Sequence, residues 1–244
     1  MKPMSAAVRA QLAPTGKLRV GLNLSNFLLV RRATPPYEGP APDLGRELAR
    51  RAGVELELIG YENAGLVADA AKTEAWDVAF IGAEPARADV ISFTPAYVEI
   101  QATYLVPAGS PIRAIEEVDR AGVKIVTTDR AAYTLFLERT IRQATLVKVP
   151  GQDETVARFA AGGFDALAGL RPRLVDEERR IAGSRLLEGR FTAIQQAMGT
   201  PKSRPALFEY LVEFGEEIKS TGLVASLIER HGAHGLTVAP LARP

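Results

Sequence analysis

The sequence contains no cysteine among its 244 residues and only two histidines. The absence of cysteine excludes disulfide scaffolds, thiolate metal sites and cysteine nucleophiles, and two histidines leave little scope for imidazole chemistry. Charge of one sign is not in excess, because 30 Lys and Arg stand against 29 Asp and Glu, a formal net charge of +1. A broad basic surface for nucleic acid is therefore not expected. We expect no metal, no cofactor and no nucleic-acid partner.

Long apolar runs are also absent. No run approaches the roughly 18 apolar residues that a membrane helix needs. The first 16 residues carry charges at Lys2 and Arg9 but no apolar stretch of about 7–15 residues, so they do not resemble a secretory signal. We expect either a cytoplasmic protein or a periplasmic one whose leader is missing from this sequence.

Several catalytic motifs are missing. The chain has no G-x-G-x-x-G dinucleotide fingerprint, no phosphate loop around Gly16-Lys17 and no G-x-S-x-G nucleophile elbow. Glu229, His231 and His234 lie close in sequence, but no further strong ligand is nearby and a solvated helix end explains them. We therefore assign no catalytic residue.

The residues that are present indicate an α/β fold. Hydrophobic residues make up 47 % of the chain, which is typical of globular proteins, and its length corresponds to roughly 1.6 average domains. Strand-like and helix-like stretches alternate. The expected strands are 17–22, 54–59, 77–81, 123–127, 146–149 and 165–168. The expected helices are 44–52, 62–74, 131–142, 154–161, 207–218 and 223–229.

Two local similarities suggest that the chain has two related halves. Residues 51–54 and 120–123 both have the sequence R-A-G-V before a strand, and residues 76–79 and 164–167 both place an aromatic residue and Asp before an apolar strand. Each of the latter strands is followed by glycine, proline and arginine, namely Gly82, Pro85 and Arg87, then Gly169, Arg171, Pro172 and Arg173. Because ligands of open α/β sheets bind beyond the carboxyl ends of strands, these arginines are expected to face a shared cleft.

The stretch that begins at Trp76, WDVAFIGAEPARADVISFTPAYV, follows a known order: Asp, apolar strand, small residues, an arginine, then aromatic-Thr-x-x-Tyr. It resembles the signature of the extracellular solute-binding proteins of family 3, the polar amino-acid-binding type of ABC transporters. Three supporting segments resemble the family's first strand, its first long helix and its late return strand with an amphipathic helix: 16–21, 42–49, and 196–199 with 207–218. The resemblance extends over about residues 16–232.

The resemblance implies a two-lobed periplasmic-binding-protein-like fold (type II), with parallel-rich sheets joined by a two-strand hinge. Lobe 1 would comprise 16–106 and 195–244, and lobe 2 would be the insertion 107–194. Such a protein captures a small carboxylate or amino-acid-like ligand between its lobes by hinge closure. It then delivers that ligand to an ABC permease in the membrane. We expect it to act as a monomer and as a binding protein rather than an enzyme.

The resemblance also implies ligand-binding residues in lobe 1. Arg87 takes the position of the family arginine that grips the ligand carboxylate, a role suited to the planar guanidinium. Asn23, Asn26 and Phe27 occupy the first strand-to-helix loop, where the family supplies a polar group and an aromatic wall. Gly82 begins a shortened stretch that replaces the usual hydroxyl-rich one.

In lobe 2 the sequence departs from the family. The family's hydroxyl-rich helix start falls near Asp129 and Arg130, so that Thr127 and Thr128, slightly upstream, are the candidate substitutes. After strand 165–168, where amino-acid binders present an aspartate for the ligand ammonium, the chain has Arg171. An arginine cannot pair with an ammonium, so the α-amino grip is absent and positive charge is added.

Four alternatives follow. The first is a binder of a small carboxylate that has two acidic groups or lacks an α-amino group, with Arg87, Arg171 and Arg130 as the anion site. The second is a standard amino-acid binder with a displaced acid such as Asp129. The third is an enzyme similar to cyclohexadienyl dehydratase, in which Glu84 or Asp129 would be the general acid. The fourth is a signal-free cytoplasmic ligand-binding or sensor protein.

Overall fold

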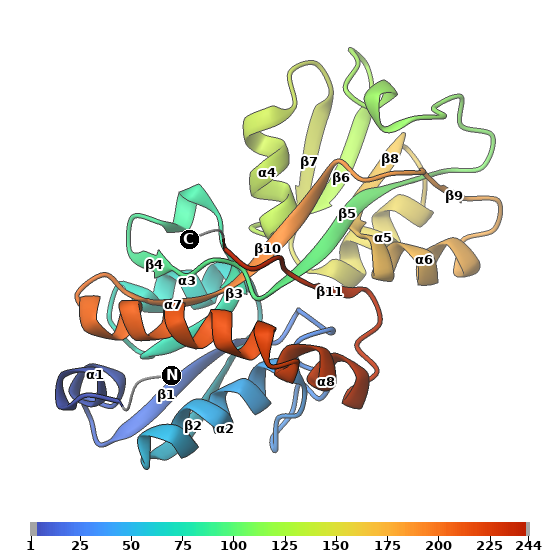
Figure 1. Cartoon of the computed structure of the whole chain (residues 1–244). Coiled ribbons are helices and arrows are strands. Elements are labelled where there is room, and N and C mark those ends of the chain that lie inside the picture. Colours follow the sequence, from blue (N-terminus) through green and yellow to red (C-terminus); the bar gives the residue numbers. More distant parts are fainter. Residues whose placement is uncertain (1–3, 243–244) are drawn as a thin grey trace. The chain divides into compact units, whose positions relative to one another are not determined.

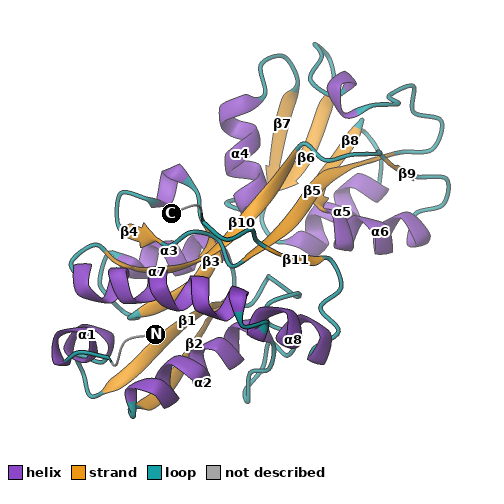
Figure 2. Ribbon diagram, viewed as in Figure 1, coloured by secondary structure: helices purple, strands orange, loops and turns teal. Residues whose placement is uncertain are grey.

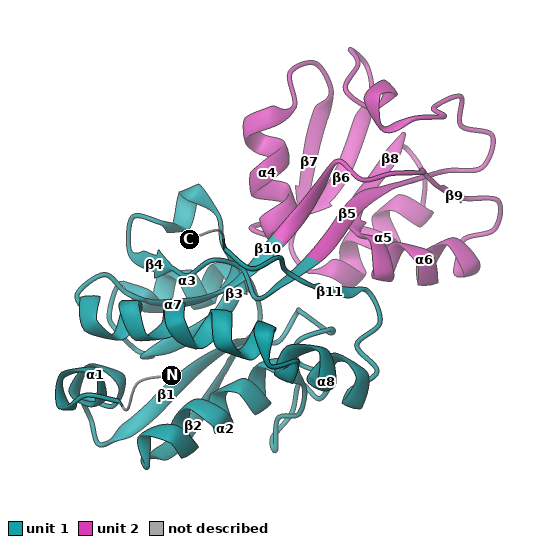
Figure 3. Cartoon of the chain, in the orientation of Figure 1, with its two compact units in different colours: residues 1–99, 195–244 teal, residues 100–194 magenta. Residues whose placement is uncertain are grey.

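The computed structural model describes residues 4–242 (Figure 1), so that positions 243–244 of the expected lobe 1 lie outside the described residues. The chain is mixed α/β and divides into two compact units (Figure 3). Unit 1 comprises residues 1–99 with 195–244, and unit 2 comprises residues 100–194. This division assigns 100–106 to the second unit, whereas the sequence assigned them to the first lobe. The return boundary is the same in both descriptions.

Three parallel strands form the centre of the sheet in unit 1: β1 (Lys17–Asn23), β2 (Glu55–Tyr61) and β3 (Val78–Gly82). They lie in the order β2-β1-β3, and β10 (Thr192–Pro201) runs antiparallel to β3. The short strand β4 (Ile91–Phe93) pairs with β10. All five residues of β3 are buried, which confirms the central parallel strand expected from its apolar sequence.

Helices complete unit 1 (Figure 2). They are α1 (Ala6–Leu12), α2 (Pro40–Ala52), α3 (Ala64–Ala71), α7 (Pro205–Ser220) and α8 (Leu223–Arg230), and the strand β11 (Leu236–Val238) follows them. The predicted stripe of Leu44, Leu48 and Ala52 is buried on α2, which ends where Gly53 takes a left-handed conformation with φ +63°. Within residues 4–242, no helix is long and apolar enough to span a membrane.

The sheet of unit 2 repeats this plan. Its parallel strands are β6 (Lys124–Thr128), β7 (Thr145–Val149) and β8 (Ala166–Leu170), in the order β7-β6-β8. The strand β5 (Val98–Val106) runs antiparallel to β8. The helices are α4 (Ala132–Thr140), α5 (Gln152–Ala160) and α6 (Arg171–Arg180), and the short β9 (Arg185–Leu186) pairs with β5. Strands β5 and β10 carry the chain from one unit to the other.

Each unit fastens its third parallel strand with an aspartate. In unit 1 the Asp77 carboxylate accepts the Arg19 backbone N–H at 2.8 Å, and the Asp77 N–H donates to the Arg19 carbonyl at 2.8 Å. In unit 2, Asp165 makes the same two bonds with Lys124, at 2.8 and 2.9 Å. The aromatic-Asp similarity therefore marks equivalent places. The R-A-G-V similarity does not, because it precedes β2 in one unit and β6, the counterpart of β1, in the other.

The aspartate of unit 1 is also the centre of a charge network. Asp77 is fully buried and pairs with the side chains of Arg19, at 2.7 Å, and of Arg204. Arg204 precedes α7, is nearly buried, and pairs with Glu74 at 2.8 Å. Its guanidinium also donates to the carbonyl of Gln11, in α1. One buried carboxylate thus joins β1 and β3 to the segment that returns from unit 2.

The two aspartates allow a matched test of this network. An asparagine at either position keeps an acceptor for the backbone N–H, so only Asp77→Asn removes a buried carboxylate from Arg19 and Arg204, of which Arg204 keeps its pair with Glu74. We expect Asp77→Asn to lower the free energy of unfolding by about 3–5 kcal/mol and Asp165→Asn by about 1 kcal/mol or less. Urea unfolding of both variants measures the difference, and equal losses would contradict the network's importance.

Candidate functional site

The β1–α2 segment holds the two asparagines that the sequence selected. The Asn23 side-chain oxygen accepts from the backbone N–H of Ser25 at 3.2 Å and from its hydroxyl at 2.8 Å. Asn26 is buried, and its side-chain oxygen accepts from the N–H groups of Leu28 and Leu29 at 3.3 Å each. Both amides therefore shape the turns after β1. Their contact with a ligand stays a prediction.

Phe27 lies between these turns. Its side chain is half-buried, and its carbonyl accepts from the Arg31 guanidinium at 3.1 Å. The structure thus places Asn23, Asn26 and Phe27 in one short segment at the carboxyl end of β1. The role of Phe27 as an aromatic wall stays a prediction.

The carboxyl end of β3 brings Gly82, Glu84 and Arg87 together. Gly82 is the last residue of β3, and Arg87 ends the 3₁₀ turn Pro85–Arg87 that follows. Arg87 is only 4 % exposed, and its guanidinium donates to the Gly82 carbonyl at 2.6 Å. Glu84 is 6 % exposed, and its carbonyl accepts the Arg87 N–H at 2.9 Å. A buried cation and a buried carboxyl group therefore share one short turn.

In unit 2 the predicted residues Thr128, Asp129 and Arg130 follow one another where β6 ends. Thr128 is the buried last residue of β6. The Asp129 N–H donates to the carbonyl of Val149 at 2.8 Å, and Arg130 takes a left-handed conformation with φ +58°. The Asp129 carboxylate is partly exposed and lies 4.0 Å from the Lys148 ammonium. These residues form the turn into α4, and their contact with a ligand stays a prediction.

Arg171 is the first residue of α6 rather than part of a loop. Its guanidinium donates to the carbonyls of Leu187, at 3.3 Å, and of Gly189. These are backbone carbonyls of the segment that follows β9. Arg173, two residues further along α6, lines a cavity instead.

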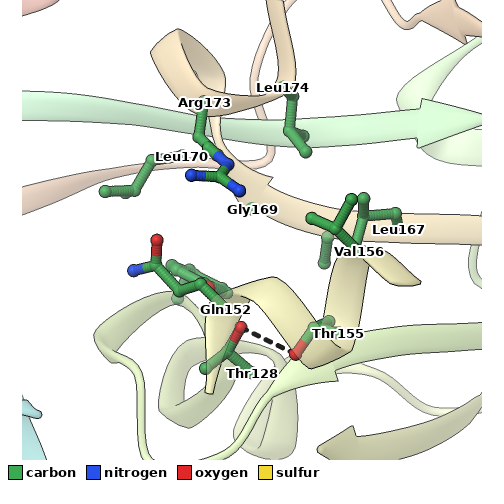
Figure 4. A pocket seen from close by; sticks show the side chains of 11 residues that line it. Thr128, Gln152, Thr155, Val156, Leu167, Gly169, Leu170, Arg173 and Leu174 are labelled. Atoms are coloured by element: carbon green, nitrogen blue, oxygen red, sulfur yellow. Dashed lines mark hydrogen bonds between the residues drawn. The ribbon is translucent and has the colours of Figure 1, made fainter. Parts of the chain in front are cut away.

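That cavity lies wholly within unit 2, at the carboxyl ends of β6 and β8 (Figure 4). Its volume is about 20 Å³, enough for one water-sized group. The polar residues that line it are Thr128, Tyr133, Gln152, Thr155 and Arg173. Sequence analysis selected only Thr128 among them as a ligand-binding residue. The others lie in the first turns of α4, α5 and α6. Of these, only Arg173 had a signal in the sequence that could have led to its selection, because an arginine follows the equivalent strand in each unit.

Hydroxyl groups on one side of the cavity form a directed chain. The Thr155 hydroxyl donates to the Gly151 carbonyl at 2.7 Å, so it can only accept from the Thr128 hydroxyl, 3.1 Å away. A hydrogen bond also joins the side chains of Thr128 and Tyr133, and it lowers the pKa of the phenol against the larger effect of burial. Burial raises the pKa of Tyr133 to about 12, so the phenol is protonated at neutral pH.

Arg173 is the one charged residue among those that line the cavity. Its guanidinium lies 2.8 Å from the Asp153 carboxylate, which is 92 % exposed, and 2.7 Å from that of Glu177, which is buried. Glu177 also lies 3.4 Å from the guanidinium of Arg180. The exposed pair with Asp153 is screened by water, so Glu177 is the stronger partner of Arg173.

Among residues 4–242, no three His, Asp or Glu side chains are grouped so that they could hold a metal ion.

Comparison with solved structures identifies the class of fold. A mutant of the protein named ArgBP from T. maritima is similar with a TM-score of 0.75, at 18 % identity over 93 % of this chain and 100 % of that one. A putative ABC transporter binding component from Wolinella succinogenes, complexed with lysine, has a TM-score of 0.74, at 22 % identity over 88 % of this chain and 95 % of that one. The fold is therefore that of the two-lobed periplasmic-binding proteins.

A model of the bacterial extracellular solute-binding proteins, family 3, matches residues 18–234. The chain therefore belongs to this family, as the motif after Trp76 indicated. An ancestral amino-acid-binding protein, described as a precursor of cyclohexadienyl dehydratase, is also similar, with a TM-score of 0.74 at 19 % identity over 92 % of this chain and 99 % of that one. No curated protein matches the sequence.

The hydroxyl chain gives a double-mutant test. Thr155→Val removes the acceptor of the buried Thr128 hydroxyl, and Thr128→Val leaves Thr155 without its donor, so each is expected to cost about 1–3 kcal/mol of unfolding free energy. The double variant leaves neither partner unmatched and should cost less than the sum of the two. Urea unfolding checks this, with the exposed Thr140→Val as a control within about 0.5 kcal/mol of the parent. Strict additivity would contradict the chain.

Proposed function

We propose that this protein captures a small carboxylate or amino-acid-like solute by closure of its two units and delivers it to an ABC permease. The working form would be a monomer. The observation that carries the proposal is Arg87, a buried guanidinium at the carboxyl end of the central strand β3 in a chain of this family. A guanidinium held in that position matches a carboxylate through paired, charge-assisted hydrogen bonds.

Two neighbours support a solute of this kind. The similar structure from W. succinogenes is complexed with lysine. A substrate-binding protein from Streptococcus pneumoniae, described with bound L-arginine, has a TM-score of 0.74 at 18 % identity over 91 % of this chain and 97 % of that one. Both ligands carry the α-carboxylate that we assign to Arg87.

A second candidate function is a dehydratase that acts on a cyclic carboxylate. The observation that favours it is Glu84, a buried carboxyl group one short turn from Arg87. A dehydratase needs a general acid beside its substrate, and Glu84 is the carboxyl group that this turn supplies. Incubation of the protein with prephenate or arogenate separates the two functions. Release of product that is lost in Glu84→Gln would establish the enzyme, and no turnover is expected for a binding protein.

The proposed function predicts that Arg87 is required for binding. A thermal-shift screen of amino acids and small carboxylates finds a stabilising solute, and calorimetry then compares variants. Arg87→Lys keeps the charge but loses the planar fork, so binding should weaken by roughly 10- to 100-fold. Arg50→Lys, on the exposed face of α2, is the control and should bind as the parent does. If both variants, Arg87→Lys and Arg87→Ala, fold and bind the solute with unchanged affinity, Arg87 does not bind the solute carboxylate.

A further inference from the structure

The C-terminal segment 236–242 is folded against the start of a strand that passes between the units. This segment, which we call the C-terminal strap, comprises β11 and the residues that follow it. Strand β11 pairs with β5, the strand that leaves unit 1 after Glu99 (Figure 3). The match to the family model ends at residue 234. The strap therefore lies outside the region of the chain that matches the family.

Hydrogen bonds from backbone N–H groups fasten the strap to unit 1. The Ala239 N–H donates to the carbonyl of Tyr97 at 3.1 Å, and the Ala242 N–H donates to the carboxylate of Glu216, in α7, at 2.9 Å. Tyr97 is fully buried and directly precedes β5. Its own N–H donates to the carbonyl of Gln196, in β10, at 2.9 Å. The residue before β5 is therefore held on one side by the returning strand and on the other by the strap.

A buried lysine joins the same segments through its side chain. Lys219 lies in the last turn of α7, and its side chain is only 2 % exposed. Its ammonium donates to the carbonyls of Ala96, at 3.1 Å, and Pro240, at 2.8 Å, and pairs with Glu216 at 2.7 Å. A lysine at a helix end can bond the last carbonyls of its own helix, but this one bonds the strap and the segment that leads into β5. Because a buried ammonium is costly without its partners, it holds both carbonyls in place.

The position of these contacts determines what they restrict. The strap, Lys219, Ala96 and Tyr97 all belong to unit 1, so their contacts do not depend on how the two units are arranged. They fix the base of β5 and leave its bending to residues after Glu99. A strand with a fixed base samples fewer conformations than one with a free base. Less conformational entropy is then lost when the units close.

We propose that the C-terminal strap and Lys219 form a brace that restricts the motion of the two units in the solute-free protein. The brace lowers the entropic cost of closure and so tightens solute binding. This inference rests on the proposed function, because it takes closure of the units to be the step that captures the solute. The restriction itself is a property of the free protein and can be measured without a solute.

The absence of cysteine allows a direct measurement of this motion. Lys72→Cys, at the end of α3, and Arg179→Cys, on α6, place one spin label in each unit at exposed positions. Double electron–electron resonance then gives the distribution of distances between the labels. We expect a broader distribution in Lys219→Met, which keeps the apolar stem and loses the ammonium. A chain that ends at Gly235, and so lacks the strap, should show the same broadening.

Leu241→Ala is the matched control, because Leu241 lies in the strap but is 55 % exposed. Its distribution should be as narrow as that of the parent. Circular dichroism shows which variants are folded. An unchanged width in the folded variants that lack the ammonium or the strap, or an equal broadening in Leu241→Ala, would overturn the brace.

Calorimetry tests the consequence for binding, with L-lysine, L-arginine, L-glutamate and succinate as probes. Lys219→Met should weaken the binding of those that bind the parent by about 5- to 30-fold, with the loss in the entropy and the enthalpy nearly unchanged. Equal or tighter binding despite a broader distribution would overturn the link between the brace and solute capture.

The outcomes also separate this inference from the function on which it rests. Arg87→Lys should weaken binding without broadening the distribution, because Arg87 belongs to the proposed solute site and not to the strap. If neither these probes nor the wider screen gives binding, the proposed function fails. The distance distribution of the free protein then still decides whether the brace exists.

Discussion

In each unit, one aspartate joined to the first parallel strand fixes where the third strand begins. Asp77 and Asp165 each bind both backbone groups of a single residue, Arg19 or Lys124, so neither partner strand can slip by a residue without losing two hydrogen bonds. A slip of one residue would also turn every buried side chain to the other face. The register in turn decides which residues emerge at the carboxyl edge of the sheet. The turn that carries Arg87 and the cavity of unit 2 both lie at that edge, and both depend on this pairing.

The same contact serves an additional purpose in unit 1. Unit 1 is discontinuous, because its sheet is completed by the segment that returns after unit 2. Arg204, at the start of α7, pairs with the buried Asp77 and so fastens the returning segment to β1 and β3. Unit 2 is continuous, and Asp165 makes its two bonds there without a buried arginine of this kind among the interactions described. The additional ion pair, made by Arg204, is therefore found in the unit that is built from two separate stretches of the chain.

The sequence predicted the central elements of both sheets because their patterns are simple. Strand β3 is a short apolar run, and α2 carries a regular apolar stripe ended by Gly53. Strand β5 was not predicted, because its sequence lacks a regular alternation and most of its residues are buried. Helix α6 was missed for the opposite reason, because it is mostly charged and Leu174 is its one buried apolar residue. Periodicity detects a strand or helix with one covered face, and neither segment is of that kind.

The sequence predicted where the candidate residues lie in the fold, but it did not predict how their charged groups are paired. Residues after a parallel strand lie at the carboxyl edge wherever the strand is correctly assigned, which is why Arg87 and Thr128 could be selected. Arg171 and Arg173 also follow a strand, but residues two apart on a helix point in different directions. One guanidinium accordingly turns to the carbonyl of Leu187 and the other to the cavity. Of the two carboxylates that pair with Arg173, Glu177 lies one turn along the same helix and Asp153 comes from a different helix. A position after a strand reports neither contact, so the sequence located these arginines without showing which groups they pair with.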